Sequence, residues 1–263
     1  MPSNVTTIHD LAKMKQDGRP IPVLTCYDYT SAKILDSAGV PVLLVGDSLG
    51  MVVHGFPSTL PVTLDMMIHH CQAVVRGSTN ALIVLDLPFA TYAADDIPLS
   101  LRSAARALAE GGAHAVKIEG GSGMARVVAA LVASGIPVMG HIGLTPQSIN
   151  QFGGYSMQGK EEAKRKRLIA DALELESAGA FAIVLELVAH DLSEQISQRI
   201  KIPTIGIGAG KGCDGQVQVF HDVFGIYEDF VPKHTRRYAT VADSIRTAAK
   251  AYVADVQAKR FPK

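Results

Sequence analysis

The chain has 263 residues, of which 48% are hydrophobic and 19% are charged, and its formal net charge is zero. This composition is typical of a globular protein with a large core, and the balanced charge argues against long-range attraction to nucleic acid or to an anionic membrane. The length suits one (β/α)8 barrel and does not require a second domain.

The N-terminal segment and the cysteines indicate the compartment. Residues 1–20 mix acidic and basic side chains and contain no apolar stretch of the signal-peptide kind, and no apolar run elsewhere reaches the length of a membrane span. Cys26, Cys71 and Cys213 lie far apart without Cys-x-x-Cys spacing, which argues against a disulfide framework and a structural zinc site. We therefore expect a cytoplasmic protein that binds neither membranes nor nucleic acid.

Short apolar runs alternate with longer amphipathic stretches along the chain. Apolar runs that do not alternate with polar residues are typical of parallel strands buried on both faces. The runs predict eight strands, at residues 22–28, 40–48, 81–89, 113–121, 136–145, 180–188, 202–210 and 216–226.

Helical patterns precede, separate and follow these strands. Thr63 is a plausible N-cap for one of them, and several helices end on a glycine that is followed almost at once by the next strand. The predicted helices span residues 7–17, 63–79, 98–111, 123–134, 159–179, 191–200 and 241–258.

Eight strand–helix units without a break in composition predict an α/β fold. We expect a single (β/α)8 TIM barrel that forms one catalytic domain over residues 1–263, with an N-terminal helix before strand one that covers the barrel floor. The alternative is an open doubly wound sheet. It is disfavoured because the usual dinucleotide fingerprint does not follow the first strand.

Polar side chains recur where the predicted strands end. Isolated charges inside apolar strands cost several kcal/mol each unless they are paired or coordinated. Since the active site of such a barrel lies at the carboxyl ends of its strands, these residues should converge on one pocket. They are Asp47 and Ser48 on strand two, Asp86 on strand three, Lys117 and Glu119 on strand four, His141 on strand five and Glu186 on strand six.

The cluster has more carboxylates than fixed cations. Asp47, Asp86, Glu119 and Glu186 are set against Lys117, so a hard divalent cation would correct the imbalance. Oxygen ligands suit Mg²⁺, whereas histidine is too sparse here to favour zinc.

Each of these residues also has a purely structural interpretation. Asp47 could cap the turn that follows it, and Asp86 could stabilise a turn before Pro88. Lys117 and Glu119 lie two residues apart on one face of a strand and could form a simple ion pair. The same neighbouring carboxylate would keep the lysine charged, which disfavours Schiff-base chemistry.

Two further side chains and one segment have alternative roles. Glu186 could act as a general base or be a core carboxyl bonded to backbone amides, and His141 could bind a substrate oxygen or only a loop carbonyl. The glycine-rich segment 205–215 could let the backbone approach a ligand or could only form a tight turn. Residues 49–62 are a candidate lid over the pocket.

The motifs together resemble the ketopantoate (3-methyl-2-oxobutanoate) hydroxymethyltransferase family, within the phosphoenolpyruvate/pyruvate barrels. The resemblance covers almost the whole chain, and its motifs occur in order. The matching phrases are LTCYDYTSAKILDSAGV, LLVGDSLGMVVHGFPSTLPVTLDMMIHH, LDLPF, AVKIEGG, MGHIGLTPQ, VLELV, IGIGAGKGCDGQV and HDVFGI.

The resemblance implies a role for most of the clustered residues. Asp47 and Asp86 would ligate Mg²⁺, and Glu119 would reach the metal through water. Ser48 would touch the substrate carboxylate, Lys117 would contact the oxo acid, and Glu186 would accept a proton. We expect Asp47, Ser48, Asp86, Lys117 and His141 to form the substrate site.

The implied reaction moves a hydroxymethyl group from 5,10-methylenetetrahydrofolate to 3-methyl-2-oxobutanoate. It gives 2-dehydropantoate through a Mg-stabilised enolate, as the first step of pantothenate biosynthesis. The resemblance also implies a homo-oligomer, typically a decamer. One alternative is a folate-independent lyase or isomerase of the phosphoenolpyruvate/pyruvate type, and another is a non-catalytic barrel used for binding or assembly.

Overall fold

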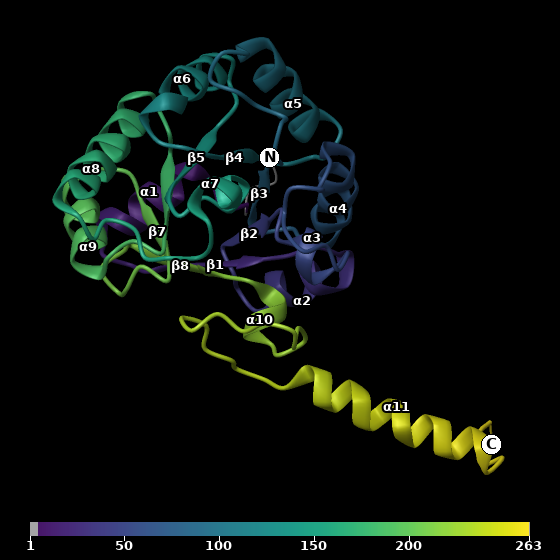
Figure 1. Cartoon of the computed structure of the whole chain (residues 1–263). Coiled ribbons are helices and arrows are strands. Elements are labelled where there is room, and N and C mark those ends of the chain that lie inside the picture. Colours follow the sequence, from purple (N-terminus) through teal and green to yellow (C-terminus); the bar gives the residue numbers. More distant parts are fainter. Residues whose placement is uncertain (1–4, 263) are drawn as a thin grey trace. The chain divides into compact units, whose positions relative to one another are not determined.

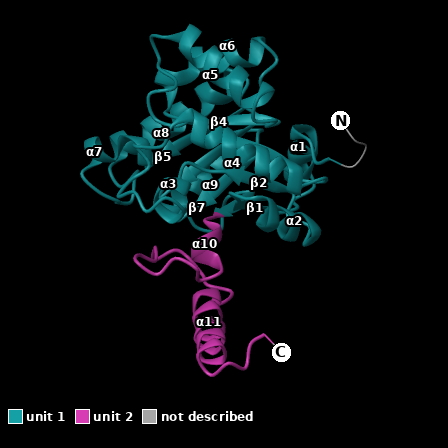
Figure 2. Ribbon diagram, turned by 90° about the vertical axis from the view of Figure 1, so that its right-hand side faces the viewer, with its two compact units in different colours: residues 1–217 teal, residues 218–263 magenta. Residues whose placement is uncertain are grey.

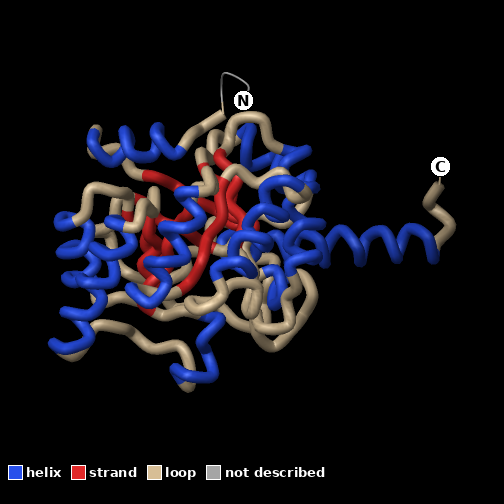
Figure 3. Tube along the Cα trace, turned by 90° about the horizontal axis from the view of Figure 1, so that it is seen from above, coloured by secondary structure: helices blue, strands red, loops and turns tan. Residues whose placement is uncertain are grey.

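The computed structural model describes residues 5–262, and within them parallel strands form a closed barrel in the order β1 to β8 (Figure 1). The strands lie inside the helices when the chain is viewed from above (Figure 3). The predicted α/β barrel fold is thereby confirmed. The strands are β1 (Ile21–Thr25), β2 (Val42–Val45), β3 (Leu82–Asp86), β4 (Ala115–Glu119), β5 (Val138–Gly143), β6 (Ala182–Glu186), β7 (Thr204–Ile207) and β8 (Gly215–Gln218).

The predicted helices are present to within a few residues, and the structure adds a nine-residue helix between the first two strands, which the sequence analysis missed, and several short helices. They are α1 (Ile8–Gln16), α2 (Tyr29–Ser37), α3 (Leu49–Val52), α4 (Leu64–Gly77), α5 (Ile97–Ala109), α6 (Ala125–Ala133), α7 (Ile149–Phe152), α8 (Glu162–Ser177), α9 (His190–Arg199), α10 (Phe220–Val223) and α11 (Val241–Gln257), with 3-10 turns η1 (Ser122–Met124) and η2 (Pro146–Ser148). None of these helices combines the length and the apolar composition needed to cross a bilayer.

Side-chain caps fix where several helices begin. The Thr63 hydroxyl accepts a hydrogen bond from the Met66 amide, as the sequence predicted for the N-cap of α4. Asp28 caps α2 in the same way by accepting from the Ser31 amide. Asp28 therefore has a structural role at the end of the first βα loop.

The prediction of a strand over residues 216–226 was wrong beyond Gln218. Residues Phe220–Val223 form the short helix α10, in which the Val219 carbonyl accepts from the amides of Asp222 and Val223. The Phe220 and Phe224 rings lie 4.8 Å apart between centroids, one helical turn apart in sequence. That spacing is helical, whereas a run that mixes apolar and polar residues is also compatible with a strand.

The barrel interior is filled by alternate residues of the strands. Val23, Leu44, Val84 and Met139 belong to one buried apolar cluster that also includes Ala115, Val184 and Ile205. Side chains two residues apart on a strand point to the same face. Positions two residues further along the same strands therefore continue the interior towards the carboxyl end of the barrel.

Helix α1 closes the amino-terminal end of the barrel. Leu11 is fully buried within the interior cluster, and Ile8 and Met14 pack against it. Lys15 Nζ donates to the Ser197 and Ile202 carbonyls and pairs with Asp214 at 2.8 Å. The predicted floor helix is thus held by both apolar contacts and an ion pair.

Clustering of backbone contacts divides the chain into two compact units (Figure 2). The first ends at Val217 and contains the barrel strands almost entirely, and the second begins at Gln218 and contains α10 and α11. Within the second unit the Tyr238 amide donates to the Val223 carbonyl and the Val241 amide to the Phe224 carbonyl. That residues 1–263 form one catalytic domain stays a prediction.

Candidate active site

Strand register brings the polar strand-end residues together. Asp86 on β3 lies opposite Lys117 on β4, and Glu119 on β4 lies opposite His141 on β5. Asp86, Lys117 and His141 each follow an interior core residue by two positions. They therefore form the next layer of the barrel interior, above the apolar core.

Asp86 joins β2, β3 and β4 at this layer. Its Oδ1 lies 2.9 Å from Lys117 Nζ in a buried ion pair, and its Oδ2 accepts from the Asp47 amide at 3.2 Å. The Lys117 ammonium therefore balances the charge at Oδ1. Asp86 is a buried carboxylate whose two oxygens face a lysine and a backbone amide.

His141 lies between the basic and the acidic side chains. Its Nδ1 is 3.1 Å from Lys117 Nζ and 3.4 Å from Glu119 Oε1, and its Nε2 is 3.3 Å from Glu186 Oε2. The imidazole therefore connects Glu186, on β6, to the residues of β4. Glu186 has 14% of its side chain exposed and lies at the accessible edge of this group.

Gln147 and Tyr92 belong to the same cluster, although the sequence did not single them out. Gln147 Nε2 donates to Asp47 Oδ2 at 2.9 Å, and the Gln147 amide donates to Glu119 Oε2 at 3.0 Å. Tyr92 Oη donates to Gln147 Oε1 at 2.7 Å. Charges at strand ends point to neither residue, because both side chains are neutral and lie in the segments that follow β5 and β3. The sequence gives one indication of Gln147, which is its place at the end of the MGHIGLTPQ motif.

Ser48 contacts a residue from the first βα loop. Its Oγ lies 2.8 Å from Tyr27 Oη, and either hydroxyl can donate. Gly46 occupies the interior position beside it, where an added Cβ would come within 2.9 Å of Ser48 Oγ and 3.5 Å of Asp86 Oδ2. A side chain at position 46 would therefore intrude on the cluster.

Burial and mutual repulsion perturb the carboxyl groups strongly. Burial, together with the charges of Asp86 and Glu119, raises the pKa of Asp47 to about 8. Burial also raises the pKa of Asp86, whereas His141 and Lys117 lower that of Glu119 against the effect of burial. Without a further cation, ionisation of all the carboxyl groups of the cluster is therefore unfavourable.

The neighbouring carboxylates also raise the pKa values of the two basic residues. Burial lowers the pKa of Lys117, but Asp86, Glu119 and Asp47 outweigh it and raise this pKa above its ordinary value. Burial and Lys117 lower the pKa of His141, but Glu119 and Glu186 outweigh them and raise it to about 9. A lysine held in its charged form is unsuited to Schiff-base formation.

The contacts of Asp47, Asp86 and Lys117 differ from those that their purely structural interpretations require. Ser48, without a side-chain capping bond, occupies the N-cap position of α3, so Asp47 is not a helix cap. Asp86 contacts Asp47 and Lys117 in place of a turn at Pro88, and Lys117 pairs with Asp86 across the strands.

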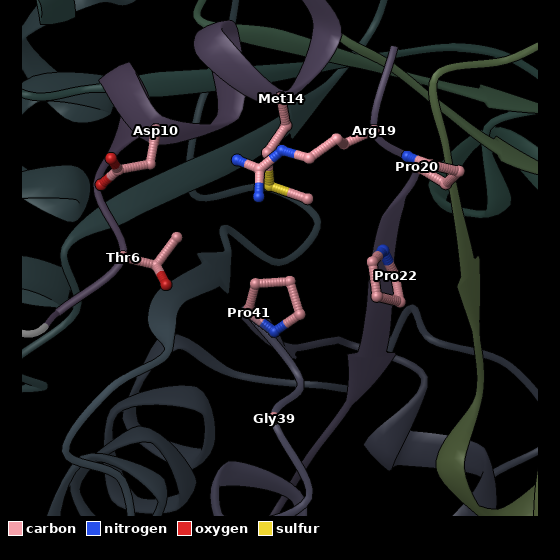
Figure 4. Close-up of a pocket in the computed structure, with 8 residues that line it drawn as sticks. All are labelled: Thr6, Asp10, Met14, Arg19, Pro20, Pro22, Gly39 and Pro41. Carbon is pink, nitrogen blue, oxygen red and sulfur yellow. The ribbon is translucent and has the colours of Figure 1, made fainter. Parts of the chain in front are cut away.

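Other candidate features lie outside the cluster. The glycines of segment 205–215 pack against their own chain, since a Cβ at Gly212 would lie 2.6 Å from Glu194 Cβ and one at Gly215 would lie 2.3 Å from the Ile21 carbonyl oxygen. Their small size serves close packing. Figure 4 shows a pocket of about 520 Å³ lined by Met14, Arg19 and Pro41 among others. This pocket lies at the amino ends of the strands, opposite the cluster.

The cluster has the oxygen ligands that an open divalent metal site requires. Within residues 5–262 no group of three or more His, Cys, Asp or Glu side chains is already arranged as a metal cage. Mg²⁺ commonly uses only one or two carboxylates and keeps several waters. Asp47 and Asp86 are buried carboxyl groups close to each other and to Glu119, and they fit that open kind of site.

The chain is similar to a known enzyme family over almost its whole length. The family model for ketopantoate hydroxymethyltransferase matches residues 5–263. The 3-methyl-2-oxobutanoate hydroxymethyltransferase of Chloroflexus aurantiacus is 56% identical over 256 residues, which are 97% of this chain and 90% of that protein. The enzyme of the same name from Dehalococcoides mccartyi is 56% identical over 257 residues, 98% of this chain and 92% of that protein.

Solved structures share the barrel at much lower identity. Phosphonopyruvate hydrolase has a TM-score of 0.63 and 11% identity, covering 97% of this chain and 88% of that chain. A 2,3-dimethylmalate lyase has a TM-score of 0.60 and 17% identity, covering 96% and 88%. These likenesses show the fold. The family match and the relatives at 56% identity show that this enzyme belongs to the ketopantoate hydroxymethyltransferase family.

Proposed function

We propose that the chain carries out the family's hydroxymethyl transfer at the cluster around Asp86, with Mg²⁺ as cofactor and 5,10-methylenetetrahydrofolate as the one-carbon donor. The acceptor is 3-methyl-2-oxobutanoate and the product is 2-dehydropantoate. The observation that carries the proposal is a buried layer in which Asp47, Asp86 and Glu119 surround Lys117, with Glu186 at its accessible edge.

Asp47 and Asp86 would hold the metal ion directly, and Glu119 would reach it through water. Such an ion, when bound, polarises the keto group of a 2-oxo acid and so acidifies the neighbouring C–H bond. The raised pKa of Asp47, which results from burial and from the charges of Asp86 and Glu119, supports a cation at this place.

The remaining side chains would bind substrate and move a proton. Ser48 Oγ would donate to the substrate carboxylate, and the Lys117 ammonium would stabilise negative charge as it develops on the keto oxygen. Glu186 would take the proton from C3, and its Oε2 lies 3.3 Å from His141 Nε2. Carbon C3 would then attack the methylene carbon of the folate and open one of its two C–N bonds. Water would replace the second folate nitrogen and supply the hydroxyl oxygen, and tetrahydrofolate would leave with both nitrogens protonated.

Loss of the C3 proton of 3-methyl-2-oxobutanoate in D₂O, followed by NMR, tests this proposal. We expect exchange that depends on Mg²⁺ and precedes addition of folate. Glu186→Gln should abolish exchange but leave metal-dependent substrate binding, whereas Glu174→Gln, an exposed change on α8, should leave both intact.

Two results would contradict these roles. Full exchange in the Glu186→Gln variant would exclude Glu186 as the base. Absence of both exchange and folate-dependent turnover in the unaltered enzyme would exclude the transfer reaction, and turnover without folate would favour a lyase or isomerase.

We also propose a cytoplasmic homo-oligomer, with the decamer implied by the family resemblance as the expected size. Cys26, Cys71 and Cys213 are free thiols, as a reducing compartment maintains them. Helix α11 exposes Ile245, Tyr252, Val253 and Val256 within its own unit. Apolar side chains at this spacing on one helix are typical of a surface that another subunit covers.

A further inference from the structure

The Gln147 side chain is a buried amide whose polar atoms are all engaged. Its Nε2 donates at 2.9 Å both to Asp47 Oδ2 and to the Leu87 carbonyl oxygen. Its Oε1 accepts from Tyr92 Oη at 2.7 Å, and its backbone amide donates to Glu119 Oε2 at 3.0 Å. One residue therefore contacts the ends of β2, β3 and β4 at once.

These partners allow only one orientation of the amide. Asp47 Oδ2 and the Leu87 carbonyl are both acceptors, so the NH₂ group must face them and use both its hydrogens. A flipped amide would set its oxygen against these two acceptors. The orientation of Gln147 is thus determined by its surroundings.

Tyr92 completes the arrangement from the loop after β3. Its hydroxyl donates to Gln147 Oε1 and accepts from the Glu119 amide at 2.9 Å. Tyr92 is thereby anchored to β4 while it holds Gln147. The contacts form a continuous chain from Asp47 through Gln147 and Tyr92 to the backbone of Glu119.

We propose that Gln147, held by Tyr92, is a positioning residue that fixes the carboxylates of Asp47 and Glu119 for a divalent cation. This inference rests on the proposed function, in which both carboxylates serve the metal. Two buried carboxylates repel each other and would rotate apart if they were unrestrained. Gln147 binds one oxygen of each, so the carboxylates are oriented before the ion arrives and less reorganisation opposes its binding.

The experiment measures Mn²⁺ binding by electron paramagnetic resonance, in the absence of substrate. The Gln147→Met substitution keeps the length of the side chain and removes the side-chain amide. We expect this variant to bind Mn²⁺ about 10- to 100-fold more weakly. Tyr92→Phe removes a single hydroxyl and should weaken binding less, in the same direction. Gln72→Met is the matched control, because Gln72 donates to the Glu110 carbonyl between helices, and its Mn²⁺ affinity should equal that of the unaltered enzyme.

A second measurement separates positioning from general damage. In Tyr92→Phe, a raised Mg²⁺ concentration should restore kcat, with only the half-saturating Mg²⁺ concentration increased. A merely structural role would lower the melting temperature and leave a deficit in kcat that Mg²⁺ does not restore. That outcome would overturn the inference, as would unchanged Mn²⁺ affinity in a folded Gln147→Met or Tyr92→Phe protein.

Failure of the inference can be distinguished from failure of the proposed function. If the unaltered enzyme binds Mn²⁺ and exchanges the C3 proton while both variants bind Mn²⁺ equally well, only the positioning role is wrong. If the unaltered enzyme neither binds Mn²⁺ nor shows metal-dependent exchange, the proposed metal chemistry is wrong, and the inference is overturned with it.

Discussion

At the scale of single residues, Gly46 shows how closely the barrel interior fits its polar cluster. The residue continues the interior side of β2 after Leu44, but the space that its side chain would fill is taken by Ser48, Thr25 and Asp86. Its backbone has no left-handed conformation, so close approach alone requires glycine.

Gly46→Ala should damage substrate binding more than folding. The new Cβ would lie 2.9 Å from Ser48 Oγ, so the hydroxyl must turn and lose its contact with Tyr27. We expect a raised KM for the 2-oxo acid with a loss of about 1–3 kcal/mol in unfolding free energy, measured by steady-state kinetics and denaturant titration. The control is Gly123→Ala, where a Cβ meets nothing within 4 Å. An unchanged KM in Gly46→Ala would show that Ser48 does not contact the substrate.

At the scale of elements, Asp36 joins α2 to the turn between α4 and β3. Its carboxylate accepts from Ser78 Oγ at 2.7 Å and from the amides of Asn80 and Ala81 at 3.0 and 2.9 Å. Burial raises the pKa of Asp36, but these hydrogen bonds outweigh it and lower the pKa to about 2. The ionised side chain therefore stabilises the folded chain.

Asp36→Asn should lower the unfolding free energy by about 2 kcal/mol at neutral pH, since the folded pKa lies nearly two units below its ordinary value. A depressed pKa gives stability that is present above about pH 4 and is lost as the pH falls towards 2. The difference between the unaltered protein and the variant, measured by urea unfolding, should therefore shrink over that interval. Asp95→Asn, at an exposed position, is the control. A difference that does not change with pH would mean that the carboxylate charge contributes nothing.

At the scale of the whole molecule, the exposed face of α11 predicts self-association. Tyr252→Asp would place a charge among Ile245, Val253 and Val256, which should reduce the assembly to smaller species in light scattering coupled to size exclusion. Thr247→Asp, on the opposite side of the helix, should leave the mass unchanged. A mass of 27.9 kDa for the unaltered protein would contradict the proposed assembly.

Local sequence patterns were sufficient for the barrel and for most of its polar cluster. Strands and helices alternate with the periods that buried parallel strands and amphipathic helices require, and the observed strands β1 to β7 lie largely within the predicted runs. The cluster could be anticipated because a charge inside an apolar run is costly, and the fold class places all strand ends on one face. The prediction for the last strand was wrong beyond Gln218, because a mixed run of aromatic and polar residues is compatible with the periodicity of a helix as well as with that of a strand.

What only the tertiary structure decided is which partner each side chain has. Lys117 pairs with Asp86 on the neighbouring strand and not with Glu119 on its own, because register across the barrel determines these contacts. Gln147 reaches Asp47 from a position 100 residues away, and no local period connects them. The sequence by itself determined which faces are apolar and where the charges lie along each strand, because side-chain direction alternates locally. Closure of the barrel sets the distances between strands. It therefore decides that Lys117 pairs with Asp86, that neutral residues lie between the carboxylates, and that only glycine fits at position 46.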